Sequence, residues 1–269
     1  MVTGGRPVAL TIAGTDSGGG AGMTADLKTF DAHGVWGTAA VTAVTAQSTT
    51  GVHRWQWVSP DLVRAQIASV VTDIGVTATK TGMLGSLAVT EAVAQAVRDF
   101  GLQPLVVDPV MVSTSGSRLL DEQAIETLWL SLLPMATVAT PNLEEAAALA
   151  GFPVVDRATM EEAGRVLAGV GPRVVMITGG HLPDDDRCPD LLVADGSLTW
   201  LDGPRLPSLH THGSGCVLSA AVCAELARGM EPADACVAAK RFVERAIAGG
   251  VDLGAGPGPV DPGWERRLT

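Results

Sequence analysis

Residues 209–220 read LHTHGSGCVLSA and join a glycine-rich turn to the start of a helical pattern. The apolar residues after the turn recur at three- and four-residue spacing, as on one helix face: Val217, Leu218, Ala221, Val222, Leu226 and Ala227. Gly213, Ser214 and Gly215 can bend the backbone so that several N–H groups point the same way. Because the first N–H groups of a helix lack partners and its dipole is positive there, the stretch predicts an anion site.

Cys216 lies in the first turn of this predicted helix. A thiol at a helix N-terminus is biased toward the thiolate, so Cys216 is a candidate base beside a bound phosphate. The same residues are compatible with a plain glycine turn before a buried helix, in which Cys216 is a small core residue. Short glycine motifs are common, so the stretch alone does not decide between these interpretations.

The composition excludes several classes of protein. The 269 residues suffice for one large α/β domain, and a mean hydropathy of +0.28 excludes a disordered chain. A net charge of −11 and only three lysines argue against a nucleic-acid or anionic-membrane surface, and no apolar run reaches the length of a membrane span. Four cysteines without C-x-x-C spacing and the absence of a signal-peptide layout favour a cytoplasmic protein without a disulfide framework or zinc site.

Short buried strands alternate with helical patterns along the whole chain. The main predicted strands are 8–13, 38–46, 78–81, 105–108, 138–140 and 174–178. A hairpin is predicted around Asp195-Gly196, a helix at 121–132, and the final helices at 215–228 and 232–248. The alternation predicts an α/β fold with a mostly parallel sheet covered on both faces. Because no composition break is present, one domain spanning 1–269 is expected.

Ligands of such sheets bind beyond the carboxyl ends of the strands. Polar and glycine-rich residues gather at these predicted ends, namely Asp16, Gln47, Gly82, Asp108, Asn142 and Thr178. The loop 14–22, GTDSGGGAG, does not place G-x-G-x-x-G as a dinucleotide fingerprint requires, and the chain contains no Gly-Lys dipeptide for a Walker A loop. An NAD oxidoreductase with a Rossmann fold is therefore disfavoured.

Several long segments together carry a resemblance to a known family. In chain order they read ALTIAGTDSGGGAGMTADLKTF, AVTAVTAQSTTGV, TKTGMLGS, VVDPVMVSTSG, LLPMATVATPNLEEA, ITGGHLPD, THGSGCVLSAAV and AKRFVERAI, from residue 9 to residue 247. The chain resembles the hydroxymethylpyrimidine/phosphomethylpyrimidine kinases of thiamine biosynthesis, within the ribokinase-like superfamily. The resemblance implies a three-layer α/β/α fold with a small β lid. It also implies transfer of the ATP γ-phosphate to the substrate hydroxymethyl group, often followed by a second transfer that gives the diphosphate.

The resemblance also implies roles at the anion loop. Cys216 would deprotonate or orient the substrate hydroxyl. Gly213, Ser214 and Gly215 would donate N–H groups to the migrating phosphoryl group, where negative charge builds up. His212 is interpreted as a loop residue that shapes this anion hole, without a zinc site.

Asp26 and Gln47 match the family's pyrimidine-binding pair. An aminopyrimidine presents an amino group and ring nitrogens, so it requires both an acceptor and an amide. Gly14, Met83 and Val110 would line the ring. The structural alternatives are an ordinary carboxylate in a first helical turn for Asp26, a loop amide for Gln47 and plain core for Met83.

ATP and Mg²⁺ are the implied cofactors. Residues 142–145 spell N-x-x-E, a superfamily motif tied to magnesium and phosphate, so Glu145 or a water that it holds is the candidate metal ligand. The alternative for Glu145 is a solvated acid stabilised by the helix dipole. Asp108, Asn142, Thr178 and Gly180 are expected near the nucleotide. Many members carry lysine at the position of Thr178, so phosphate neutralisation here would rest more on Mg²⁺ and backbone amides.

Two other functions stay open. The first is a pyridoxal kinase of vitamin B6 salvage, because pyridoxal also carries a hydroxymethyl group on an aromatic nitrogen ring. The predicted pyrimidine contacts of Gln47 and Asp26 would disfavour this function. The other is a non-catalytic pyrimidine-binding sensor, which would not need the phosphoryl-transfer motifs. The expected partners are the small pyrimidine and ATP. A homodimer is compatible with the resemblance, although the sequence indicates no interface, and no role is assigned to the C-terminal segment GAGPGPVDP at 254–262.

Overall fold

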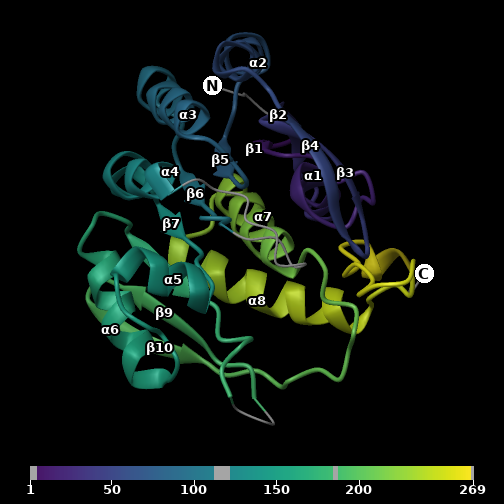
Figure 1. Cartoon of the computed structure of the whole chain (residues 1–269), viewed down its shortest axis with the longest axis vertical. Coiled ribbons are helices and arrows are strands. Elements are labelled where there is room, and N and C mark those ends of the chain that lie inside the picture. Colours follow the sequence, from purple (N-terminus) through teal and green to yellow (C-terminus); the bar gives the residue numbers. More distant parts are fainter. Residues whose placement is uncertain (1–4, 112–121, 184–186, 268–269) are drawn as a thin grey trace.

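The computed structural model describes residues 5–111, 122–183 and 187–267, in which a twisted sheet carries helices on both faces (Figure 1). This sheet has eight strands in the order β10-β9-β8-β7-β6-β5-β1-β2. Its strands are β1 (Val8–Ala13), β2 (Trp36–Val41), β5 (Ala78–Thr81), β6 (Leu105–Val107), β7 (Val138–Ala139), β8 (Val174–Ile177), β9 (Asp190–Ala194) and β10 (Ser197–Leu201). All neighbours from β8 to β2 are parallel, and only β9 and β10 pair antiparallel, which confirms the predicted sheet.

Two apolar cores form because successive side chains of each strand point to opposite faces of the sheet. The helices are α1 (Gly22–Ala32), α2 (Pro60–Asp73), α3 (Leu87–Phe100), α4 (Glu122–Thr127), α5 (Leu143–Ala150), α6 (Arg157–Ala168), α7 (Ser214–Ala227) and α8 (Pro232–Ala248). Helices α2 to α6 cover the core that contains Leu10 and Ile12, and α1, α7 and α8 cover the core that contains Ala9. The predicted three-layer α/β/α arrangement is therefore confirmed. Within the described ranges, no helix has the length and apolar character needed to cross a membrane.

Helix α7, which begins in the glycine turn at 213–215, is buried on all sides. Every residue from 217 to 227 is buried, and the helix packs against α1, α8 and the strands β1, β5 and β6. Small side chains such as Ala220, Ala221 and Ala224 allow this close approach. A mostly apolar helix is expected in such a place, because it has no face for water, and its buried polar residues Ser219 and Glu225 are hydrogen-bonded.

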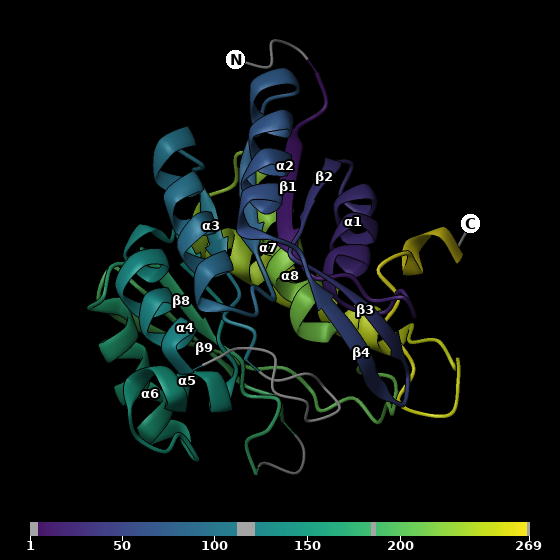
Figure 2. The same ribbon diagram turned by 45° about the horizontal axis from the view of Figure 1, so that its top comes forward.

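The predicted strand 38–46 is two strands in the structure. The chain leaves the main sheet at Thr42, whose N–H donates to the Ala13 carbonyl (3.0 Å) and whose Oγ1 donates to the Met83 carbonyl (2.6 Å). Beyond this bend, β3 (Ala43–Ser48) and β4 (Gly51–Trp57) form a separate antiparallel hairpin. Figure 2 shows the hairpin projecting from the body, close to the C-terminal segment. This hairpin is the predicted β lid.

Two further predictions concern local backbone geometry. The hairpin at Asp195-Gly196 is confirmed: both residues have positive φ (49° and 74°), as a tight turn between β9 and β10 requires. The predicted helix 121–132 is α-helical only from Glu122 to Thr127 and continues as a π-helical turn (Leu128–Leu132). Residue 121 lies outside the described residues.

A buried ion pair closes α1 against α7. His33 Nδ1 donates to Glu225 Oε1 (2.8 Å), and Arg228 donates to the same oxygen (3.1 Å). The hydrogen bond from His33 holds the pKa of Glu225 below its ordinary value. The pair therefore links stability to pH.

Glu225→Gln is expected to weaken the dependence of Tm on pH at acid pH. A carboxyl with a lowered folded pKa stabilises the fold above its unfolded pKa of about 4.3, and this contribution is lost as pH falls through the folded pKa. The Tm of the wild type should therefore fall more steeply than that of the variant below about pH 4.3. The exposed Glu231→Gln is the control, and parallel curves for wild type and Glu225→Gln would contradict the linkage.

Candidate active site

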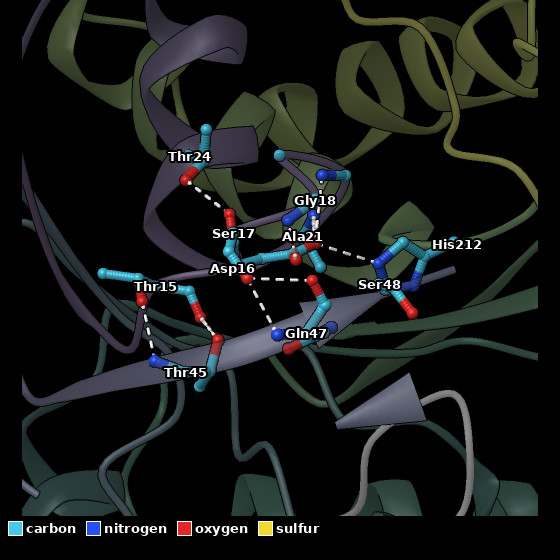
Figure 3. A network of polar contacts seen from close by, with 12 residues as sticks. Thr15, Asp16, Ser17, Gly18, Ala21, Thr24, Thr45, Gln47, Ser48 and His212 are labelled. Carbon is cyan, nitrogen blue, oxygen red and sulfur yellow. Dashed lines mark hydrogen bonds and ion pairs between the residues drawn. The ribbon is translucent and has the colours of Figure 1, made fainter. Parts of the chain in front are cut away.

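Asp16 organises the glycine-rich loop between β1 and α1 (Figure 3). Its Oδ1 accepts from the Gly18 N–H (2.8 Å), and its Oδ2 accepts from the N–H groups of Gly20 (3.0 Å) and Ala21 (2.8 Å). His212 Nε2 lies 3.0 Å from the same Oδ2. Burial alone would raise the pKa of Asp16, but the hydrogen bonds from His212 and Gly18 bring it below its ordinary value. A charged Asp16 thus joins this loop to the anion loop through His212.

The two glycine loops touch closely enough to exclude side chains. Gly213 has a φ of +80°, and a Cβ on it would lie 1.9 Å from the Gly20 carbonyl oxygen. The Ser214 N–H donates to the Thr211 carbonyl (3.2 Å), so it is already used. The N–H groups of Gly215 and Cys216 form no hydrogen bond with other described residues. The Gly213 N–H likewise forms no hydrogen bond with other described residues, so the N–H groups of Gly213, Gly215 and Cys216 are the donors that the start of α7 offers to an anion.

Cys216 lies beside these donors and is partly exposed. The Gly22 N–H donates a hydrogen bond to its sulfur, and the ammonium of Lys80 is nearby. Desolvation outweighs both and raises the pKa of Cys216 to about 12. The expected bias toward the thiolate is therefore wrong for this structure: the group is a thiol at neutral pH.

A buried ionic network lies beneath the anion loop and was not predicted from the sequence. Lys80 is fully buried in β5, with its Nζ 3.0 Å from both carboxylate oxygens of Asp26 and 3.5 Å from Asp108 Oδ2. Thr11 donates to Asp26 Oδ2 (2.6 Å), and Ser219 donates to Asp108 Oδ2 (2.8 Å). Burial alone would lower the pKa of Lys80, but the two carboxylates raise it far above its ordinary value. The ammonium is therefore permanently charged.

The predicted contact between Asp26 and the pyrimidine does not agree with this geometry. Asp26 is fully buried, and its two oxygens are taken by Lys80 and Thr11. Its carboxylate balances the charge of Lys80 instead of facing a ligand. The signal in the sequence was a lysine inside the four-residue buried strand ATKT, since a buried ammonium requires a buried partner.

Gly14, Met83 and Val110, which were predicted to line the substrate ring, lie together at the carboxyl ends of β1, β5 and β6. Met83 and Ala43 form a small buried cluster, against which Val110 and Trp57 pack. A Cβ on Gly14 would lie 3.2 Å from the Met83 sulfur, so the backbone of Gly14 lies against the same cluster. These groups form an apolar wall below the lid.

Gln47 lies on the lid strand β3, above this wall. Its backbone N–H and carbonyl both bond to the Ser17 hydroxyl (2.8 Å each), which fixes the lid to the glycine loop (Figure 3). The register of β3 shifts between Ala46 and Gln47, and such a bulge re-aims a side chain. The Gln47 side-chain amide forms no hydrogen bond with other described residues and is half-buried. It is therefore available to read a polar edge of a ligand.

The predicted nucleotide residues lie at the ends of three neighbouring strands. Asp108 follows β6, Asn142 follows β7 and Thr178 follows β8, with a single bridge between Asn142 and Thr178. Gly180 is exposed, and its carbonyl accepts from Arg205 (2.9 Å). The topology thus gathers Asp108, Asn142, Thr178 and Gly180 along one edge of the sheet.

Glu145 is held in place by a capping box. The Glu145 N–H donates to Asn142 Oδ1, and the Asn142 N–H donates to Glu145 Oε2 (2.9 Å each). Burial and the nearby Asp108 raise the pKa of Glu145 to about 8. Glu145 is therefore not the solvated acid of the alternative interpretation.

Two buried carboxylates, of which Asp108 raises the pKa of Glu145, fit a cation. Mg²⁺ takes oxygen ligands, usually one or two carboxylates with several waters and substrate phosphates. No cluster of three or more metal-binding side chains lies among the described residues, which therefore offer no all-protein cage. The pair Asp108 and Glu145 matches the sparse carboxylate set that Mg²⁺ uses beside a nucleotide.

The family model described as phosphomethylpyrimidine kinase matches residues 16–261. The chain belongs to the phosphomethylpyrimidine kinase family. A hydroxymethylpyrimidine/phosphomethylpyrimidine kinase from Streptomyces coelicolor is 49% identical over 259 residues, which cover 96% of this chain and 95% of that protein. The resemblance stated from the sequence motifs is therefore confirmed.

Solved structures place this phosphomethylpyrimidine kinase family member among ribokinase-like kinases. A Bacillus subtilis pyridoxal kinase, solved as an ADP complex, has a TM-score of 0.91 at 38% identity over 97% of this chain and 99% of that chain. A phosphomethylpyrimidine kinase from Clostridium difficile has a TM-score of 0.79 at 36% identity over 90% of this chain and 100% of that chain. Both structural similarities support a ribokinase-like fold and membership of the kinase class for this chain.

Proposed function

We propose that this protein phosphorylates 4-amino-5-hydroxymethyl-2-methylpyrimidine with ATP, and then its monophosphate to the diphosphate, in thiamine biosynthesis. The observation that carries the proposal is one juxtaposition: the unbonded N–H groups at the start of α7 lie beside Cys216, below a lid that carries Gln47. In a chain 49% identical to a hydroxymethylpyrimidine/phosphomethylpyrimidine kinase, this arrangement supports recognition of the ring and stabilisation of the phosphoryl group at one site.

Each part of the site has a task in this reaction. The apolar wall at Met83 and Val110 holds the face of the pyrimidine, and the Gln47 amide pairs with its polar edge. The substrate hydroxyl attacks the γ-phosphorus while the bond to ADP breaks, and the hydroxyl proton leaves to water. The N–H groups of Gly215 and Cys216 stabilise the charge on the moving phosphoryl oxygens.

Cys216 fits an orienting role at this centre. The transition state of phosphoryl transfer is loose, so positioning and charge stabilisation carry most of the catalysis. A thiol with a pKa of about 12 is not a base at neutral pH. It can still hold the substrate hydroxyl in line with the phosphate. The rate is then expected to show no dependence on thiolate formation between about pH 6 and 9.

Mg²⁺ fits beside Asp108 and Glu145, directly or through waters. When bound, it would neutralise charge on the nucleotide phosphates. ATP use is supported by the ADP complex of the Bacillus subtilis relative. A cytoplasmic location is proposed because all four cysteines are free thiols, as a reducing compartment keeps them.

Pyridoxal kinase activity is the second candidate. It is favoured by the TM-score of 0.91 with the Bacillus subtilis pyridoxal kinase. Pyridoxal and hydroxymethylpyrimidine both carry the hydroxymethyl group that accepts the phosphate. They differ at the polar edge of the ring, which Gln47 would recognise. A sensor without catalysis is disfavoured because the anion loop and the Asn142–Glu145 capping box are both intact.

The deciding experiment compares ATP-dependent phosphorylation of hydroxymethylpyrimidine and of pyridoxal by the wild type, with mono- and diphosphate products resolved by mass. Pyrimidine diphosphate is the expected product. A preference for pyridoxal would change the assigned function to a pyridoxal kinase of vitamin B6 salvage. Binding of the pyrimidine without turnover of either substrate would support the sensor and overturn the kinase assignment.

Gln47→Ala is expected to raise KM for hydroxymethylpyrimidine about tenfold with little change in the KM for ATP. The reason is the loss of about 1.4 kcal/mol from a hydrogen-bonded ring edge. Initial rates at varied pyrimidine concentration give the result. Gln56→Ala, in the same hairpin and exposed, is the matched control. Equal KM values for Gln47→Ala and the control would remove Gln47 from the substrate site.

A further inference from the structure

The C-terminal segment 254–260, here called the strap, packs against the turn of the lid. The Gly256 N–H donates to Thr49 Oγ1 (3.2 Å), and Thr49 lies in the turn between β3 and β4. A Cβ on Gly254 would lie 2.2 Å from Thr49 Oγ1, and one on Gly256 would lie 2.0 Å from the Thr49 carbonyl oxygen. The strap therefore runs against the lid backbone with no room for a side chain at either glycine.

The other end of the strap pairs with the anion loop. The His212 N–H donates to the Gly258 carbonyl (3.2 Å), and the Val260 N–H donates to the His212 carbonyl (3.1 Å). The Gly258 N–H also donates to His210 Nδ1 (3.2 Å). His212 and Pro259 form a parallel bridge. The strap thus pairs, through one isolated parallel bridge and its flanking hydrogen bonds, with the residues that precede the Gly213 turn.

The strap also touches the third part of the site, the loop that Asp16 organises. A Cβ on Gly20 would lie 2.8 Å from the Pro259 Cβ and 2.6 Å from the His212 ring. Gly20 in turn donates to Asp16. One segment therefore contacts the lid turn, the anion loop and the glycine loop, although these lie about 50 to 240 residues away from it in sequence.

We propose that the strap is a positioning element of the active site, which holds the lid strand that carries Gln47 in register with the anion loop at Gly213. This proposal rests on the proposed function. Thr49 is two residues from Gln47, and His212 is next to Gly213, so the strap fixes the distance between the group that reads the ring and the donors that bind the phosphoryl group. The alternating glycines of GAGPGP are required because each lies against backbone or a bonded side chain.

The test uses Gly256→Ala in the full chain, with Gly263→Ala as the matched control. Alanine at 256 cannot fit against the Thr49 carbonyl, whereas alanine at 263 would meet only the end of the Asp261 side chain at 3.3 Å. The expected result for Gly256→Ala is about tenfold faster amide hydrogen exchange in β3 and β4, with exchange in the main sheet unchanged. Its kcat/KM for the pyrimidine should fall about tenfold to a hundredfold, while the KM for ATP stays unchanged.

Thr49→Val supplies an independent variant, because it removes the acceptor of the Gly256 N–H without filling space. Relative to Gly256→Ala, a smaller rise in lid hydrogen exchange and a smaller fall in kcat/KM are expected. The separate variant Thr49→Ser keeps the hydroxyl and should show wild-type exchange and kinetics. Unchanged exchange in the lid of Gly256→Ala, or faster exchange throughout the sheet with a lowered Tm, would overturn the proposal. If the wild type shows no kinase activity, the proposed function fails, and the exchange measurement still decides whether the strap holds the lid.

Discussion

Cys216→Ala is expected to lower kcat/KM for hydroxymethylpyrimidine phosphorylation by at least about a hundredfold. The thiol lies beside the N–H groups of the 213–216 turn that are left without hydrogen-bond partners among the described residues, those of Gly213, Gly215 and Cys216. Removing it takes away the group that orients the hydroxyl without altering the backbone of the anion hole. Initial-rate measurements of ADP release, with the Tm measured in parallel, would give the result.

Two cysteine variants and a pH profile make this prediction specific. Cys216→Ser keeps a polar atom in place and should recover part of the activity, and Cys223→Ala removes a buried sulfur from the same helix and should leave kcat/KM unchanged. A rate that rises tenfold per pH unit across the neutral range would show that the thiolate is the active form, against the pKa of about 12. Loss of less than fivefold in Cys216→Ala would remove the residue from the reaction.

Lys80→Met is expected to be the most destabilising single change considered. It leaves Asp26 fully buried without its counter-ion and removes the cation beside Asp108. Breaking one side of a buried ion pair costs about 3–5 kcal/mol, which corresponds to a fall in Tm on the order of 10 °C. Thermal unfolding followed by circular dichroism would measure it.

The matched control for Lys80→Met is Lys28→Met. Lys28 is exposed and its ammonium donates only to the Gly19 carbonyl, so its loss should change Tm by less than about 2 °C. The double variant Lys80→Met with Asp26→Asn should recover part of the lost stability, because no uncompensated charge then remains at position 26. A Tm for Lys80→Met equal to that of Lys28→Met would show that the network contributes little.

The fold was predictable because it rests on local patterns. Short apolar runs followed by helical patterns give the parallel sheet, and Asp195-Gly196 gives the β9–β10 hairpin. The bend at Thr42 was missed because the run TAAVTAVTA has no glycine or proline, and only tertiary bonds to Ala13 and Met83 divide it into two strands. Tertiary contacts of this kind leave no mark in a local window.

The sequence could place Gln47, Met83 and Asn142 at or just after strand ends, because each follows from a short local strand pattern. The candidate site was not predictable where residues act through one another. Asp26 in α1 and Lys80 in β5 lie 54 positions apart, and the packing of α1 on β1 together with the pairing of β1 with β5 brings them together. The predicted bias of Cys216 toward the thiolate was wrong for a similar reason. Burial by segments distant in sequence raises the pKa of Cys216 more than the local helix dipole could lower it.

The burial of α7 on every side bears on how such an enzyme changes over evolutionary time. A helix made of small residues and enclosed by α1, α8 and the sheet tolerates almost no enlargement, since overpacking a filled core costs about 1–3 kcal/mol per change. The end of the site at the start of α7, where phosphoryl transfer is proposed, is therefore expected to accept few substitutions. The lid hairpin is attached to the body by a few hydrogen bonds and a glycine strap, and can accept substitutions. New acceptor preferences are expected to arise there first, so a library for altered specificity belongs in 43–57 and not in α7.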